Sequence, residues 1–294
     1  MFIGQVLNGL VNGAMYSLVA LGFTLIIGVL DKLNFTHPEI FMFGGFAGIV
    51  SMTYLPAPWA LVVSFLVGGT LGLITEWIAF RRFKTTDSKI TAALSSMALG
   101  LVFTDCVQKY WGTEPVSLPA LPTWLEKNVL IAGVEFPYLN FFILSVTCLL
   151  MIALHYLIHK TRMGRHIRAV AESTINASLL GIDVKRVSQV VFFISSGLAA
   201  EAGFLLSLRS ASANSEIGLT FGLKALAIMA IGGLGDMRGA MLGGLLIGII
   251  EACLFVFGLG RWVEMAVWVV VIITMVLKPS GLFSTRLRLM EARA

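Results

Sequence analysis

Long apolar segments dominate the chain, and short polar segments separate them. An α-helix needs about 20 mainly apolar residues to cross the hydrocarbon core of a bilayer. The pattern predicts an all-α fold, a polytopic transmembrane helix bundle of eight or nine spans. The predicted spans are residues 5–30, 36–55, 59–80, 90–111, 138–158, 188–208, 221–235, 239–259 and 261–277.

The second and seventh predicted spans are the least regular. The second span opens with His37, Pro38 and Glu39, and the seventh span is short. A membrane tolerates a broken or re-entrant helix only where protein buries its backbone polar groups. Either segment is therefore a candidate for a broken or re-entrant helix inside the bundle.

Basic residues indicate the orientation, because lysine and arginine concentrate in cytoplasmic loops. They cluster in residues 81–89, in residues 160–186 and in the tail from residue 278. Segment 105–137 holds more acidic than basic side chains and is rich in proline, so we expect it outside. The C-terminus is then cytoplasmic. The N-terminus lies outside if the chain crosses the membrane nine times and inside if one element is re-entrant.

Composition excludes a soluble domain. The chain is 57% hydrophobic and only 13% charged, whereas soluble domains carry about 25% charged residues. We therefore expect residues 1–294 to form a single transmembrane domain that has the lipid membrane as its solvent. The net charge of +5 comes from basic loops between apolar segments, so it indicates membrane topology and not nucleic-acid binding.

No arrangement in the sequence is typical of an enzyme, a metal centre or a nucleotide site. Cys106, Cys148 and Cys253 lie far apart, and His155 and His159 have no third metal ligand beside them. A Walker A pattern is absent, so another chain must hydrolyse any ATP that drives transport. We expect this chain to bind no cofactor and no metal.

Glycine is abundant, with 30 residues, and several glycines are spaced by four. Small residues at that spacing let helix backbones approach closely in lipid. The pattern predicts a tightly packed bundle. The predicted packing positions include Gly44, Gly48, Gly232, Gly233, Gly239 and Gly243.

Segment 160–187 is not apolar enough to span the membrane, although it lies between two spans. Small side chains recur at helical spacing from residue 170 to Gly181, which predicts a short helix with a glycine stop. Such a helix docks on a partner, packs on its own bundle or lies at the lipid interface. The absence of Trp and Phe anchors favours a partner protein.

The same segment resembles the cytoplasmic coupling helix of the permease family of branched-chain amino acid ABC importers. The resemblance rests on Arg-Ala-Val-Ala-Glu at residues 168–172 and on Leu-Leu-Gly-Ile at residues 179–182. Other blocks are similar to further motifs of that family, in the same order along the chain. These blocks are residues 5–18, 33–45, 224–244 and 278–283.

The resemblance implies an importer built from several chains in the bacterial inner membrane. Arg168, Ala171, Glu172 and Gly181 would couple this chain to an ATPase. The implied partners are a second permease subunit, similar or identical, two ATP-binding subunits and a periplasmic substrate-binding protein. The cargo would be a branched-chain amino acid, with urea, a short amide or another amino acid as the alternative.

Polar side chains within apolar spans are costly in lipid and usually face a pathway or another helix. Asn8 and Asn12 share one face of the first span, and Asn34, Thr36 and His37 stand at the start of the second. These five residues are candidates for the substrate path. The alternative is that the amides hold helices together.

Two glutamates bear on other interpretations. Glu201 would be the coupling carboxylate if the chain were a stand-alone secondary transporter, a class that needs ionisable groups deep in the bundle. Glu251 lies toward the end of its span, and we expect it near the outer face. Neither residue is assigned to the substrate path.

Overall fold

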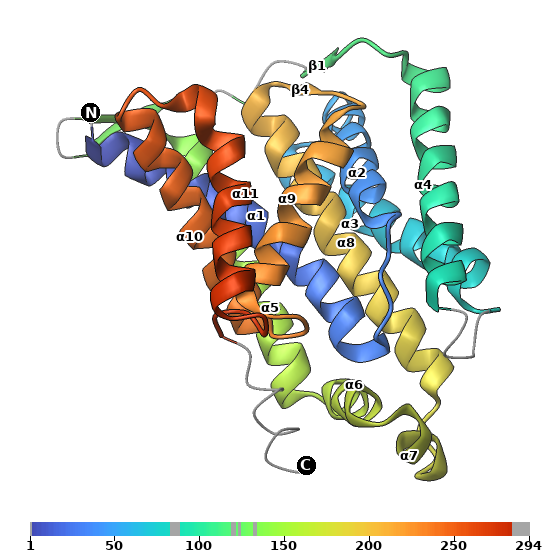
Figure 1. The fold of residues 1–294 in the computed structure, drawn as a ribbon. Coiled ribbons are helices and arrows are strands. Elements are labelled where there is room, and N and C mark those ends of the chain that lie inside the picture. Colours follow the sequence, from blue (N-terminus) through green and yellow to red (C-terminus); the bar gives the residue numbers. More distant parts are fainter. Residues whose placement is uncertain (1, 83–88, 119–121, 123–124, 132–133, 284–294) are drawn as a thin grey trace.

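The computed structural model describes residues 2–82, 89–118, 122, 125–131 and 134–283. Most of these residues are helical (Figure 1). The long helices are α1 (Phe2–Leu30), α2 (His37–Met52), α3 (Ala57–Thr75), α4 (Lys89–Trp111), α5 (Tyr138–Lys160), α8 (Val184–Ser210), α9 (Ile217–Gly232), α10 (Met237–Val256) and α11 (Val263–Leu277). The short elements are η1 (Glu76–Phe80), α6 (Arg162–Glu172), α7 (Thr174–Leu179), η3 (Gly260–Trp262) and the strands β1 (Val116–Ser117), β2 (Asn128–Ile131), β3 (Val134–Pro137) and β4 (Ser212–Ala213).

Seven helical segments among the described residues are long and apolar enough to cross a membrane. They are α1, α3 with η1, α4, α5, α8, α10 and η3 with α11. Helices α2 and α9 have 16 residues each and complete nine passes. The predicted polytopic helix bundle is confirmed. Helix α1 begins at the end of the bundle opposite to α6 and α7, as expected for nine passes (Figure 1).

The second span is broken, which is one of the two forms predicted for it, because its helix covers only His37–Met52 and non-helical residues precede it. Residues 31–36 are not helical and lead from the end of α1 back into the bundle (Figure 1). The Thr36 hydroxyl donates to the Ser96 carbonyl of α4 at 2.6 Å, and His37 Nε2 lies 3.4 Å from the Val19 carbonyl of α1. Helix α2 therefore begins beside the middle of α1. In the non-helical segment Asn34 and Thr36 are buried, whereas Leu33 and Phe35 are 44% and 37% exposed.

The seventh span is a short but unbroken helix. It covers Ile217–Gly232 and not the predicted residues 221–235. It ends there because Gly233 adopts a φ of +111°, a conformation that favours glycine and stops the helix. Gly232 and Gly239 then face each other so closely across the turn that a Cβ on either would overlap the other's backbone.

The other predicted glycine positions also lie at close contacts. A Cβ on Gly44 would overlap Ala200 of α8, and one on Gly48 would overlap the ring of Phe204. Gly243 of α10 is less tight, because its Cβ would lie 3.0 Å from the Ile228 carbonyl oxygen.

Helices α1 and α8 form the centre of the bundle, whereas α4, α5 and α11 form its rim and are mostly exposed. At the outer end, β1 pairs with β4 and β2 pairs with β3, both antiparallel. The centre of the bundle is where the buried polar side chains gather.

Candidate functional site

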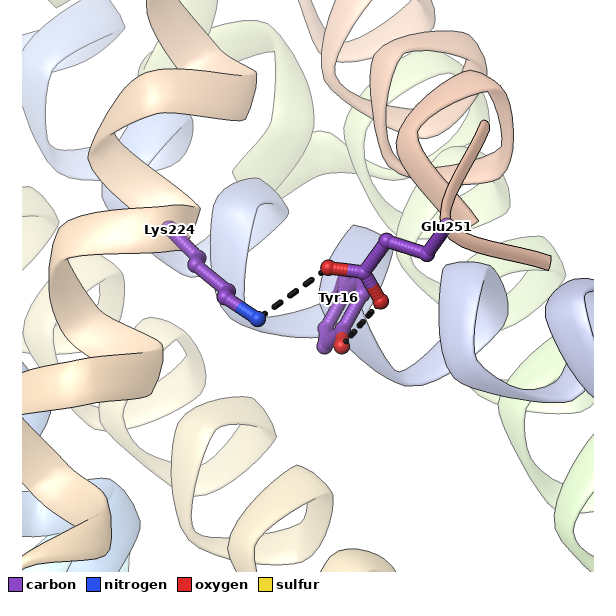
Figure 2. A network of polar contacts seen from close by, with 3 residues as sticks. All are labelled: Tyr16, Lys224 and Glu251. Atoms are coloured by element: carbon purple, nitrogen blue, oxygen red, sulfur yellow. Dashed lines mark hydrogen bonds and ion pairs between the residues drawn. The ribbon is translucent and has the colours of Figure 1, made fainter. Parts of the chain in front are cut away.

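Three side chains from three helices meet inside the bundle (Figure 2). Tyr16 of α1 donates to Glu251 of α10, with Oη and Oε2 2.8 Å apart. Lys224 of α9 donates to the other carboxylate oxygen, with Nζ and Oε1 3.1 Å apart. The Lys224 and Glu251 side chains are only 13% and 4% exposed. Glu251 therefore lies within the bundle and not on its surface.

The surroundings compensate both charges of this network. A buried ion pair is stable only when its geometry is good and further hydrogen bonds satisfy the remaining polar atoms. Tyr16 satisfies the second oxygen of Glu251. The Lys224 ammonium lies 5.7 and 5.8 Å from the ring centroids of Tyr16 and Phe221, at cation–π distance. The network joins α1, α9 and α10 without adding net charge.

Arg209 of α8 forms a second polar cluster on the same face of α1. Its Nη1 donates to Asn12 Oδ1 at 2.7 Å, and its Nη2 donates to Asn8 Oδ1 at 3.3 Å. Asn140 of α5 also donates to Asn8 Oδ1, at 3.3 Å. Within the part of the chain that the structure describes, Arg209 makes no ion pair, and its cation is held by amide oxygens.

The spacing along α1 joins these two clusters. Asn8, Asn12 and Tyr16 follow one another at intervals of four, so they lie on one face of the helix. That face carries the partners of Arg209 toward its outer end and the partner of Glu251 near its middle. We call this set of six residues, Asn8, Asn12, Tyr16, Arg209, Lys224 and Glu251, the polar stripe.

A third polar region lies in the turn before α2. Asn34 Oδ1 accepts from the Thr36 amide at 3.1 Å. His37 is fully buried, and its ring lies 4.3 Å from the ring of Phe23. Among the described residues, Asn34 Nδ2 and His37 Nδ1 have no hydrogen-bond partner. The five residues predicted for the path therefore divide between the polar stripe and this turn.

The cytoplasmic segment forms two helices where the sequence predicted one. Helix α6 ends at Glu172 because Ser173 adopts an extended conformation and caps α7, accepting from the Asn176 amide at 3.2 Å. Gly181 then follows α7 with a φ of +80°, as predicted for a glycine stop. Ile175, Leu179 and Leu180 project from this corner with 74%, 80% and 80% of their surface exposed.

The predicted coupling residues occupy different positions on this segment. Glu172 and Gly181 are exposed, and Ala171 is half-buried. Arg168 is exposed too, but its Nη1 donates to the Ile158 carbonyl at 2.6 Å, near the end of α5. Arg168 therefore fixes α6 to the bundle, and Glu172 and Gly181 lie on the surface that α7 shares.

The model of the family described as branched-chain amino acid transport system / permease component matches residues 5–276. The chain belongs to this family. The high-affinity branched-chain amino acid transport system permease protein LivH of Escherichia coli (strain K12) is 31% identical, over 96% of this chain and 95% of the relative. The corresponding protein BraD of Pseudomonas aeruginosa is 30% identical over the same shares.

The names of more distant relatives refer to sugars. The ribose import permease protein RbsC of Haemophilus influenzae is 23% identical, over 97% of this chain and 88% of the relative. No solved structure matches the chain. The family shows that this chain is a multi-pass permease subunit of the inner membrane and not an enzyme. A stand-alone secondary transporter with Glu201 as its coupling group is not supported.

The sequence pointed to Asn8 and Asn12 but missed their main partners in this permease. Arg209 lies at the end of a predicted span and Lys224 within one, where basic side chains are costly. The unfavourable position of these two basic residues, in or at the end of an apolar span, was the signal that could have identified them. Tyr16 could have been found as the next residue at an interval of four after Asn12.

Proposed function

We propose that this permease forms part of the inner-membrane path for a branched-chain amino acid in an ATP-driven importer. It would pair with a second permease subunit, similar or identical. Two ATP-binding subunits would supply the energy, and a periplasmic binding protein would deliver the substrate. Support comes from family membership, from the names of the relatives and from the absence of a Walker A pattern in the sequence.

The observation that carries the proposal is the apolar surface at the corner of α7. Helix α7 lies beyond the membrane-spanning helices, at the predicted cytoplasmic end (Figure 1). Ile175, Leu179 and Leu180 are large, exposed apolar side chains in and directly after this helix. Contiguous apolar groups in water mark interaction sites. We infer that this surface, with Glu172 and Gly181 beside it, docks in a groove of the ATPase.

The polar stripe supplies chemistry suited to a zwitterionic substrate. A carboxylate bound by the Arg209 guanidinium gains two parallel, charge-assisted hydrogen bonds, stronger than those from neutral amides. The substrate's carboxylate would replace Asn8 and Asn12 as the partner of Arg209. The stacked rings of Phe41 and Phe221, with centroids 5.6 Å apart, would offer apolar contact to its side chain.

Transport requires the bundle to alternate between states open to opposite sides. A ligand shifts such an equilibrium only by its differential affinity for the two states. ATP would provide that difference in the partner subunits, and α6 and α7 would transmit it. Arg168, which fixes α6 to α5, would keep the two helices moving together.

Co-purification tests this proposal. Leu180→Asp should reduce recovery of the ATPase with the detergent-solubilised permease by at least about tenfold, since it places a charge in an apolar contact. Leu130→Asp is the matched control, because Leu130 is 72% exposed but lies in the outer β2–β3 hairpin. Equal loss in both variants, or none in either, would contradict docking at α7.

A further inference from the structure

A cavity of about 340 Å³ lies at the cytoplasmic end of the bundle. Its walls come from α1, α5, α6 and the turn between α9 and α10. The cavity is separate from the polar stripe, none of whose six residues lines it. Here α6, part of the segment that we propose to dock on the ATPase, meets α1, α5 and the turn between α9 and α10.

The interior of the cavity is apolar. Leu21 and Val29 of α1, Met151 and Leu154 of α5 and Met241 of α10 line it. Their side chains offer no hydrogen bonds except through weakly accepting sulfur atoms. This interior is suited to a hydrocarbon chain and offers no partner to the ammonium group of an amino acid.

The rim of the cavity is cationic. Arg168 of α6 and Arg238 of α10 line it, and both are exposed. His155 and His159 add imidazoles from α5. Asp236 is the one acidic residue of the lining, and its Oδ1 accepts from the amides of Arg238 and Gly239 at 2.9 and 3.2 Å, which caps α10.

The rim also borders a face of α5 that no other described part of the chain covers. Leu149, Ile152 and Tyr156 are 66%, 68% and 62% exposed on α5, a rim helix of the bundle. His155 and His159 lie beside this face near the cytoplasmic end of the helix. A molecule could therefore enter the cavity from the membrane as well as from the cytoplasm.

From these observations we propose that the cavity binds an anionic phospholipid of the cytoplasmic leaflet. Arg168 and Arg238 hold the phosphate of its headgroup, and one acyl chain lies along Met151, Leu154 and Met241. Basic pockets between transmembrane helices on the cytoplasmic side favour such headgroups. The bound lipid bridges α6 to the turn between α9 and α10, so it stabilises the position of the coupling segment against the bundle.

Native mass spectrometry of the full-length, delipidated permease tests this site, with palmitoyl-oleoyl-phosphatidylglycerol as the probe. Arg238→Gln should weaken the first lipid-binding event by about tenfold, the loss expected for one charge-assisted hydrogen bond. Arg238→Lys keeps the charge and should retain most of the binding. Arg165→Gln is the matched control, because Arg165 is an exposed arginine of α6 that does not line the cavity.

Four results would overturn the proposal. One is equal phosphatidylglycerol binding by the wild type and Arg238→Gln, and another is equal loss in Arg165→Gln. Phosphatidylcholine binding as tightly as phosphatidylglycerol would show that charge is not recognised. Displacement of the lipid by inorganic phosphate or by leucine would assign the cavity to a soluble anion or to the transported substrate.

Discussion

Two polar regions lie along α1, and they differ in how they accommodate polarity inside a membrane protein. In the polar stripe, Glu251 has a cation and a hydroxyl as partners, and Arg209 has two amide oxygens. In the turn before α2 the partners are backbone groups, and Asn34 Nδ2 and His37 Nδ1 have no partner within the part of the chain that the structure describes. The stripe is built around charge, whereas the turn holds a non-helical backbone in place.

The five residues predicted for the substrate path therefore have different roles in the two regions. Charged groups that are not fully matched can exchange a protein partner for a substrate group, as we propose for Arg209. Neutral groups in a closely packed turn act chiefly through shape, because a ring such as that of His37 fills space between α1 and α8. Four substitutions test this difference between the polar stripe and the turn.

The largest effect is expected from breaking the ion pair of the stripe. Lys224→Met leaves the Glu251 carboxylate buried without its cation, which should lower the free energy of unfolding by roughly 3–5 kcal/mol. Titration of mixed micelles with SDS, followed by tryptophan fluorescence, measures this loss. The double variant Lys224→Met with Glu251→Met should recover most of it, and a double variant as unstable as the single one would refute the pairing argument.

The next effect concerns transport and not stability. Arg209→Gln should raise the KM for leucine uptake into proteoliposomes at least about tenfold, because a neutral amide replaces a bidentate cation. Arg209→Lys should fall in between, since an ammonium keeps the charge but loses the planar fork. Lys109→Gln, which removes an exposed cation of α4, serves as the control. An unchanged KM in Arg209→Gln would exclude contact with the substrate.

A smaller effect is expected in the turn before α2. A Cβ on Gly22 would lie 2.6 Å from the His37 ring and 2.8 Å from the Ser195 carbonyl oxygen. Gly22→Ala should therefore cost about 1–3 kcal/mol by overpacking, in the same SDS titration. We expect the KM of the folded fraction to stay close to that of the wild type. A large rise in KM without loss of stability would instead place His37 in the path.

The smallest effect is expected where the chain leaves α1. Lys89 and Asp31 form an ion pair there, with side chains 44% and 80% exposed. Asp31→Asn should change the free energy of unfolding by less than about 1 kcal/mol, because water and salt screen exposed pairs. Any larger effect that persists in high salt would show that this pair, and not the buried contacts of Thr36 and His37, fixes the non-helical segment 31–36.

Local properties of the chain were enough to predict the class and the approximate positions of the spans, with eight or nine as the count. A helix in lipid must satisfy its own backbone hydrogen bonds and needs an apolar run of sufficient length, so each span is a local property of the chain. Basic loops then orient the bundle, and Gly181 marks the end of α7. These features need no knowledge of which helices are neighbours.

The arrangement of the polar groups depends on tertiary contacts between residues that are distant in the sequence. Tyr16 and Glu251 are 235 residues apart in the sequence, and Asn12 and Arg209 are 197 apart. The cavity likewise needs α1, α5, α6 and α10 to meet at one end of the bundle. Hydropathy describes how each helix meets lipid, whereas the pairing of polar groups depends on which helix faces pack together.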